Sequence, residues 1–232
     1  MFFRLNLKSK LGSITQNIKE IRQAIPDNVD LVCVSKFHSQ ENILQAYNCG
    51  ERLFGESRVQ ELVVKYKALP KDIKWHFIGH LQRNKVRQIV PFISLIHSVD
   101  SVELLHEINR CAAKNDNKVN VLLQVHIAQE EQKFGFTPSE FKFFCENYDS
   151  QKFPFVTICG LMGMATFTED KEQIEKEFSL LSTLFFEIGS SGIFQKETFK
   201  TLSMGMSEDF PLAIEKGSTM VRVGSSIFGE RY

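Results

Sequence analysis

The sequence predicts an α/β protein, a single (β/α)8 TIM barrel with an extra helix at its N-terminal end. Short β-rich runs alternate strictly with amphipathic segments, and the 232 residues hold eight such units. Because this alternation implies parallel strands joined by right-handed crossovers, a closed barrel uses the whole chain. An open doubly wound sheet would have fewer strands and a glycine-rich turn after its first strand, where this chain has "KFHSQ".

Eight runs rich in β-branched and aromatic residues predict the strands. In chain order they are "DLVCVS" (30–35), "RLFG" (52–55), "WHFIG" (75–79), "ISLIHSV" (93–99), "VNVLLQVHI" (119–127), "FVTICG" (155–160), "FKTLS" (199–203) and "TMVRVG" (219–224). No composition shift, linker or internal repeat separates them, so we expect one domain over residues 1–232.

Apolar residues at helical spacing predict the helices that connect these strands. They cover residues 41–49, 57–68, 84–90, 101–115, 138–148, 170–189 and 208–216. A further helix is expected over 9–25, in front of the first strand. Its apolar face is formed by Leu11, Ile14, Ile18, Ile21 and Ile25.

The stretch "TPSE" at 137–140 is the clearest helix start in the chain. Thr137 is a favourable capping residue, Pro138 suits the first helical position, and Glu140 completes a capping box. The sequence therefore predicts a well-defined N-terminus for the helix that follows the fifth strand.

Charge and cysteine content favour a cytoplasmic protein with a small partner. The 28 basic and 28 acidic residues cancel, which argues against nucleic acid or an anionic membrane as partner. The five cysteines include no C-x-x-C pair, as expected in a reducing compartment. The first ten residues lack a secretory signal, and no apolar run of about 18 residues is present to span a bilayer.

Lys36 stands where the first predicted strand ends, at the end of a barrel that usually carries the functional groups. It is the only lysine among the residues that end the eight predicted strands. A desolvated lysine loses its charge more readily and becomes a nucleophile that forms imines. Position alone leaves a second interpretation open, in which Lys36 forms an ion pair with Glu56 at the rim.

The loops after the seventh and eighth strands have the composition of a phosphate site. In barrels these two loops often hold a phosphate, together with a short extra helix. Gly205 and Gly224 allow the backbone close to an anion, and Ser203 and Ser225 add hydroxyl donors. The sequence "SSIFG", which begins at Ser225, is expected to open a helical turn.

An amine and a phosphate site across one barrel mouth predict a phosphorylated aldehyde as ligand. Pyridoxal 5′-phosphate meets that description. Arg222, one residue inside the last loop, is expected to face its ring nitrogen.

Several stretches resemble the YggS/PROSC family of pyridoxal phosphate homeostasis proteins. They are "VSKFHSQENILQAYNCGERLFGESRVQEL", "WHFIGHLQRNKV", "IHSVDSVELLHEINR", "GLMGMAT" and "LSMGMSEDFPLAIEKGSTMVRVGSSIFGER", and they run from about residue 30 to the end. The resemblance implies the fold of the N-terminal barrel of alanine racemase. It also implies that Lys36 forms a Schiff base with the cofactor, that residues 203–206 and 224–225 hold the phosphate, and that Arg222 faces the pyridine nitrogen.

Ser57 departs from the pattern of that family. Many members have "GEN" where this chain has "GES", so a hydroxyl replaces an amide expected near the cofactor. A hydroxyl is shorter and lacks separate carbonyl and NH2 groups. Three candidates for the missing contact stay open: Ser57 itself, a water, and the neighbouring Arg58.

The residues favour a carrier of pyridoxal phosphate over an enzyme. Arginine offers only donors, so Arg222 would leave the ring nitrogen unprotonated and the ring a weak electron sink. Racemases with such an arginine recruit a second base from an additional domain, for which the eight units leave no residues. The resemblance likewise implies cofactor buffering or delivery to apoenzymes, and we expect a monomer.

Two other functions remain as alternatives. One is a weak pyridoxal-dependent racemase or lyase that uses His80 or His126 as proton carrier. The other is a Schiff-base aldolase or phosphosugar barrel without a cofactor. No Cys/His spacing indicates a metal site.

Overall fold

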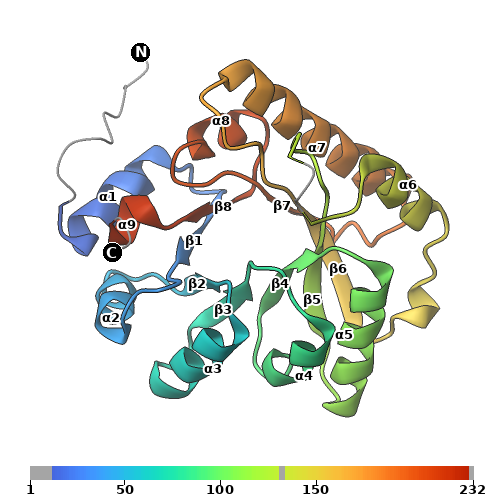
Figure 1. Ribbon diagram of the computed structural model, residues 1–232, viewed down its shortest axis with the longest axis horizontal. Coiled ribbons are helices and arrows are strands. Elements are labelled where there is room, and N and C mark those ends of the chain that lie inside the picture. Colours follow the sequence, from blue (N-terminus) through green and yellow to red (C-terminus); the bar gives the residue numbers. More distant parts are fainter. Residues whose placement is uncertain (1–11, 131–133, 230–232) are drawn as a thin grey trace.

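The computed structural model describes residues 12–130 and 134–229. Within this part of the chain eight parallel strands close into a barrel in the order β1-β2-β3-β4-β5-β6-β7-β8 (Figure 1). The strands are β1 (Asp30–Val34), β2 (Leu53–Glu56), β3 (Lys74–Phe77), β4 (Leu95–Val99), β5 (Val119–Gln124), β6 (Val156–Met162), β7 (Thr201–Ser203) and β8 (Met220–Val223). The predicted (β/α)8 barrel is confirmed.

Helices follow the strands and lie outside the barrel (Figure 1). They are α1 (Ile14–Ala24), α2 (Gln40–Asn48), α3 (Val59–Ala68), α4 (Val86–Ile89), α5 (Val102–Lys114), α6 (Pro138–Glu146), α7 (Lys171–Ser191), α8 (Phe210–Glu215) and α9 (Ser225–Phe228), with short 3-10 turns η1 (Arg83–Lys85) and η2 (Ser150–Lys152). The capping box on α6 is confirmed: Thr137 Oγ1 accepts the Glu140 N–H at 3.2 Å, and Glu140 accepts the Thr137 N–H at 2.9 Å.

The extra N-terminal helix is confirmed as α1, but it begins at Ile14 because Ser13 caps it in an extended conformation, so residues 12 and 13 of the predicted helix are not helical. Residues 9–11 of the predicted helix lie outside the described residues. Ile18 and Ile21 are buried, and Asn17 Nδ2 donates to the Ile227 carbonyl in α9 at 2.8 Å. The first and last helices therefore pack together beside the barrel (Figure 1).

The core has two parts because strand side chains alternate between the two faces of the barrel wall. The larger part fills the space between strands and helices and includes Trp75, Phe54 and Phe178. The smaller part collects side chains from five strands inside the barrel: Val32, Leu95, Leu122, Met162 and Met220. These side chains occupy part of the barrel interior, and a ligand is expected at the carboxyl ends of the strands, as in other barrels of this kind.

Candidate functional site

The predicted site residues fall on one arc of the barrel. Lys36 and Ser57 follow β1 and β2, Ser203 and Gly205 end or follow β7, and Arg222, Gly224 and Ser225 end or follow β8. Because the barrel is closed, β7, β8, β1 and β2 are neighbours. All seven residues therefore lie at the carboxyl ends of four adjacent strands.

Arg222 lies inside the barrel, and its side chain is almost fully buried. Its Nη1 donates to the carbonyl and the hydroxyl of Ser203 at 2.9 and 2.7 Å, and its Nη2 donates to the Gly163 carbonyl at 3.1 Å. A guanidinium has five N–H donors. The Nε–H and one Nη2–H thus have no acceptor among the described residues, which suits a ligand that offers a lone pair.

A chain of hydrogen bonds continues from Arg222 across the barrel. His97 Nδ1 is 3.0 Å from Ser203 Oγ, and His97 Nε2 is 3.0 Å from His76 Nδ1. Strands β4 and β7 are not neighbours, so the contact between His97 and Ser203 crosses the interior. Ser203, predicted to contact a phosphate, is thus engaged with Arg222 and His97.

Burial shifts the pKa of each titratable group in this row of hydrogen bonds. It lowers the pKa of His76 to about 3 and that of His97 well below its ordinary value, in the second case helped by the charge of Arg222. Burial also lowers the pKa of Arg222, to about 10, which still leaves it protonated at neutral pH. Among these hydrogen-bonded groups, Arg222 therefore carries the single positive charge.

Backbone N–H groups converge where the sequence predicts a phosphate. The N–H groups of Gly224 and Ser226 both donate to Ser207 Oγ, at 3.2 and 3.4 Å. These distances are at the long end for N–H···O bonds, so the contact is weak. Two donors aimed at one oxygen also suit a phosphate oxygen, and Ser207 joins the candidate site. The sequence does contain a signal for Ser207: its hydroxyl lies two residues after Gly205, in the loop after the seventh strand that is predicted to hold the phosphate.

The two predicted glycines have reasons to be glycine within the protein itself. Gly205 has φ +94°, and a Cβ there would lie 2.6 Å from Ala213 Cβ. A Cβ on Gly224 would meet Val34 at 3.2 Å. Both glycines allow the last two loops to pack closely against the barrel and α8, which fixes where their N–H groups point.

Glu56, the predicted ion-pair partner of Lys36, is bound to a different lysine. Its Oε1 accepts from Lys65 Nζ at 2.8 Å and from Ser35 Oγ at 2.6 Å. Burial raises the pKa of Glu56 above its ordinary value, against the opposing effect of Lys65. Lys36 itself is half-buried at the end of β1.

Ser57 is half-buried beside Gly79, and its side chain makes no hydrogen bond within the described residues. Arg58 is engaged elsewhere, with its guanidinium carbon 4.6 Å from the centre of the Phe37 ring. Arg58, one of the three candidates for the contact of the family's amide, is thus directed to another contact.

The two histidines of the enzyme alternative have partners in the loops. His80 Nδ1 lies 2.8 Å from Asp100 Oδ2, and its ring stacks on Phe134 at 3.8 Å. His126 Nε2 lies 2.9 Å from the Glu130 carbonyl. Neither belongs to the arc that holds Lys36 and Arg222.

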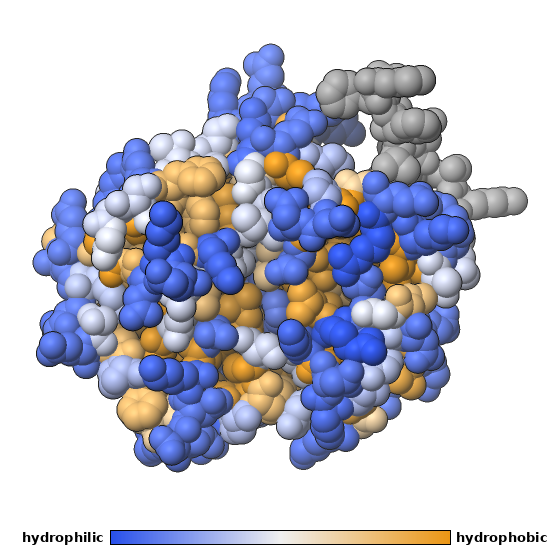
Figure 2. All heavy atoms as spheres, turned by 180° about the vertical axis from the view of Figure 1, so that it is seen from behind, coloured by the Kyte–Doolittle hydropathy of each residue, from blue (hydrophilic) through white to orange (hydrophobic). Residues whose placement is uncertain are grey.

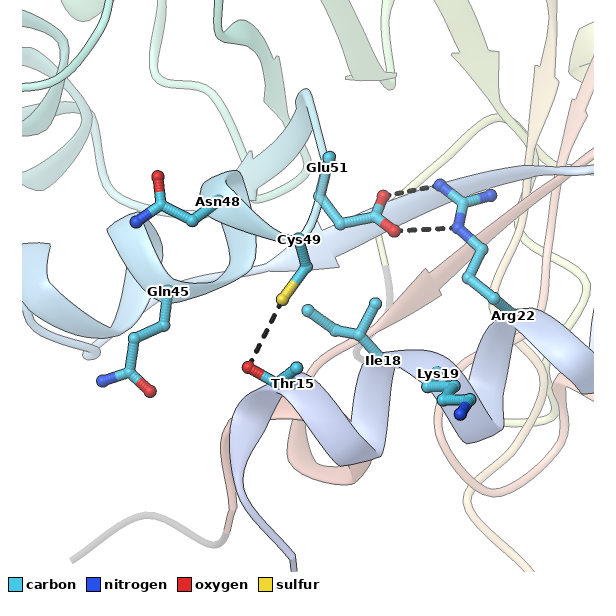
Figure 3. A pocket seen from close by; sticks show the side chains of 9 residues that line it. Thr15, Ile18, Lys19, Arg22, Gln45, Asn48, Cys49 and Glu51 are labelled. Atoms are coloured by element: carbon cyan, nitrogen blue, oxygen red, sulfur yellow. Dashed lines mark hydrogen bonds and ion pairs between the residues drawn. The ribbon is translucent and has the colours of Figure 1, made fainter.

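A surface groove lies outside this arc. A groove of about 720 Å³ separates α1 from the end of α2; Figure 3 shows the ion pair between Arg22 and Glu51 in it, at 2.5 Å. This groove adjoins the loop that enters β2, so it lies at the opposite end of the barrel. In Figure 2, apolar side chains show between polar ones across the face turned to the viewer.

Within the described residues no helix has the length and apolar character needed to cross a membrane.

Comparison with known proteins identifies the family. The family model for the alanine racemase N-terminal domain matches residues 9–232. The pyridoxal phosphate homeostasis protein of Aquifex aeolicus (strain VF5) is 41% identical over 205 residues, which cover 87% of this chain and 86% of that protein. PipY of Synechococcus elongatus PCC7942, solved without and with PLP bound, matches with TM-scores of 0.86 and 0.83 at 34% and 33% identity, over 94% of this chain and 100% of PipY. The chain therefore belongs to the family of pyridoxal phosphate homeostasis proteins, within the proteins that share the alanine racemase N-terminal domain.

Proposed function

We propose that this protein binds pyridoxal 5′-phosphate through Lys36 and acts in intracellular vitamin B6 homeostasis by buffering or delivering the cofactor. The main support for the proposal is the arc of candidate residues at the ends of β7, β8, β1 and β2. It places an amine, a buried arginine with two N–H donors that no described residue accepts, and two convergent backbone N–H groups at the ends of adjacent strands. These groups match an aldehyde, a pyridine nitrogen and a phosphate.

Each residue has a distinct role in this proposal. The Lys36 nitrogen forms a C=N bond with the aldehyde carbon, and the carbonyl oxygen leaves as water. Arg222 donates to the ring nitrogen. Ser207, Ser225 and the backbone at Gly205, Gly224 and Ser226 hold the phosphate, while Ser203 orients Arg222. Ser57 would be a further residue near the cofactor.

The arrangement around Arg222 favours a carrier over an enzyme. When bound, pyridoxal phosphate supplies an electron-withdrawing ring, and the ring withdraws most strongly when its nitrogen is protonated. Arg222 keeps its own proton, because even its lowered pKa of about 10 lies well above neutral pH. Proton donation to the ring is thus disfavoured. Delivery to apoenzymes, a monomeric state and a cytoplasmic location also belong to this proposal.

Absorbance spectra of the purified protein, with and without added pyridoxal phosphate, test the Schiff base. We expect a band near the visible edge that borohydride shifts and that Lys36→Ala abolishes. Lys67→Ala, which removes an exposed lysine on α3, should leave the band unchanged. A wild-type protein that never acquires the band would sink the proposal. Turnover of an amino acid that depends on Lys36 would instead favour the racemase or lyase alternative.

A further inference from the structure

A buried ion-paired cluster lies directly behind Lys36, between β1, β2 and α3. Its centre is Lys65, whose side chain is only 6% exposed. Lys65 Nζ donates to the Ser35 carbonyl at 2.7 Å, to Glu56 Oε1 at 2.8 Å and to Glu61 Oε1 at 2.6 Å. An ammonium has three N–H donors, so every donor of Lys65 is used.

The cluster contacts the chain on both sides of Lys36. Ser35 is held twice, by Lys65 at its carbonyl and by Glu56 Oε1, which accepts its hydroxyl at 2.6 Å. Phe37 is held by Glu61 Oε1, which accepts its backbone N–H at 2.6 Å. Lys36 is the one residue between these two anchored positions.

The backbone at Phe37 shows why an anchor is needed there. Phe37 has φ 67°, in the left-handed region that a bulky side chain adopts only at an energetic cost. The hydrogen bond from its N–H to Glu61 and the guanidinium of Arg58 over its ring both favour this conformation. The His38 N–H donates to the Ser35 carbonyl at 3.1 Å, so the chain turns directly after β1 with Lys36 and Phe37 as the central residues of the turn, and the backbone at Lys36 is coupled to that at Phe37.

Stability alone is a poor explanation for the cluster. Taking charges out of water is costly, and replacing a buried ion pair with apolar side chains is often neutral or stabilising. Here the cost is increased by Glu56 Oε2, which is buried and has no hydrogen-bond partner in the part of the chain that the structure describes.

We infer that Lys65, Glu56 and Glu61 are positioning residues for Lys36, which fix the backbone at Ser35 and Phe37 so that the Lys36 amine is presented to an aldehyde in the barrel mouth. This inference rests on the proposed Schiff base at Lys36. It concerns residues that touch neither the cofactor nor the reacting atoms, and it assigns them an effect on the speed and tightness of covalent attachment.

Two variants and a matched control test the inference. Lys65→Met removes the central cation at similar length, and Glu61→Leu removes the acceptor of the Phe37 N–H. Lys67→Met makes the same change as the first variant at an exposed position of α3, two residues further on. The rate of band formation with pyridoxal phosphate and the dissociation constant are measured for all of them. We expect both test variants to slow attachment and weaken binding roughly tenfold, because small displacements of a reacting group have large effects on rate.

Glu61→Gln separates positioning from fold stability. It keeps an oxygen to accept the Phe37 N–H, and its attachment rate should be restored toward the wild-type value relative to Glu61→Leu. Equal rates for the two Glu61 variants would contradict positioning through Phe37, as would a folded Lys65→Met protein with wild-type rate and affinity.

A second measurement does not depend on the cofactor. Reductive methylation with formaldehyde and cyanoborohydride, followed by peptide mass spectrometry, gives the reactivity of Lys36 directly. In Lys65→Met and Glu61→Leu we expect the rate at Lys36 to change about threefold or more, with the rates at exposed lysines such as Lys142 unchanged. An altered Lys36 rate in a protein that never binds pyridoxal phosphate would overturn the proposed function alone. An unaltered rate in both variants would overturn the positioning role.

Discussion

At the scale of single residues, the chemistry of the site depends on which polar partner each group has found. Ser203 ends β7, whereas Ser207 lies four positions later in the loop that follows, and the two hydroxyls have different surroundings. Ser203 is fully buried and bonded to Arg222, whereas Ser207 is half-buried and bonded only weakly, to two backbone N–H groups. The weakly bonded hydroxyl is the one that a phosphate can replace or join.

Ser207→Ala should therefore weaken binding of pyridoxal 5′-phosphate but not of pyridoxal, which lacks the phosphate. Loss of one hydrogen bond to a charged group is expected to cost about 1.5 kcal/mol, roughly tenfold in the dissociation constant. Titrations of both aldehydes, followed by the absorbance band, check this. If the variant loses affinity for both aldehydes equally, Ser207 is not part of the phosphate site.

At the scale of elements, the helices owe their positions to local signals that work with the apolar pattern. The capping box at Thr137 fixes the start of α6, and its first helical residue is the predicted Pro138. Several other boundaries shift by one or two residues. The segment predicted as one helix over 84–90 begins instead as the 3-10 turn η1 before α4.

Thr137→Ala should lower the free energy of unfolding by about 1 kcal/mol, the usual effect of removing an N-cap hydroxyl. Thermal or denaturant unfolding measures the change. Ser139→Ala, in the first turn of the same helix, is the control and should have a smaller effect, because Ser139 does not cap the helix backbone. Binding of pyridoxal phosphate should be unaffected by either change, and a Thr137→Ala protein as stable as the wild type would refute the capping role.

At the scale of the whole molecule, the closed barrel buries ionisable groups in its interior. His76 and His97 are neutral in the folded protein because burial disfavours their charged forms. In the unfolded chain they take up protons below their ordinary pKa of 6.5. Protons therefore bind the unfolded state preferentially, so this contribution to stability is present above pH 6.5 and is lost as the pH falls.

We expect His76→Asn to reduce the pH dependence of unfolding. Asparagine keeps a polar atom near the position of Nδ1, where His76 contacts His97. For the wild type the free energy of unfolding should fall by about 1.4 kcal/mol per pH unit for each such histidine as the pH drops below 6.5 toward 3. In the variant, the free energy of unfolding should change with pH less steeply, by the contribution of one histidine. His106→Asn, at an exposed position, is the control, and an identical slope for wild type and His76→Asn would contradict a neutral buried His76.

The barrel fold, and the end of the barrel at which the candidate site residues lie, could be predicted from the sequence. Strict alternation of two hydrophobic periods determined the barrel, and the order of strands then determined that Lys36, Arg222 and the last two loops share one end. These are consequences of local pattern and chain connectivity, which are written in the sequence itself.

Only the tertiary structure decided which side chains meet. One interpretation of the sequence paired Glu56 with Lys36, but the carboxylate of Glu56 accepts a hydrogen bond from Lys65 on α3. His97 and Ser203 are 106 positions apart and meet because closure of the barrel brings β4 and β7 across the same interior. Such contacts are set by the radius of the barrel and by the packing of helices on it. No spacing within the sequence encodes those quantities, because they arise from the whole set of strands at once.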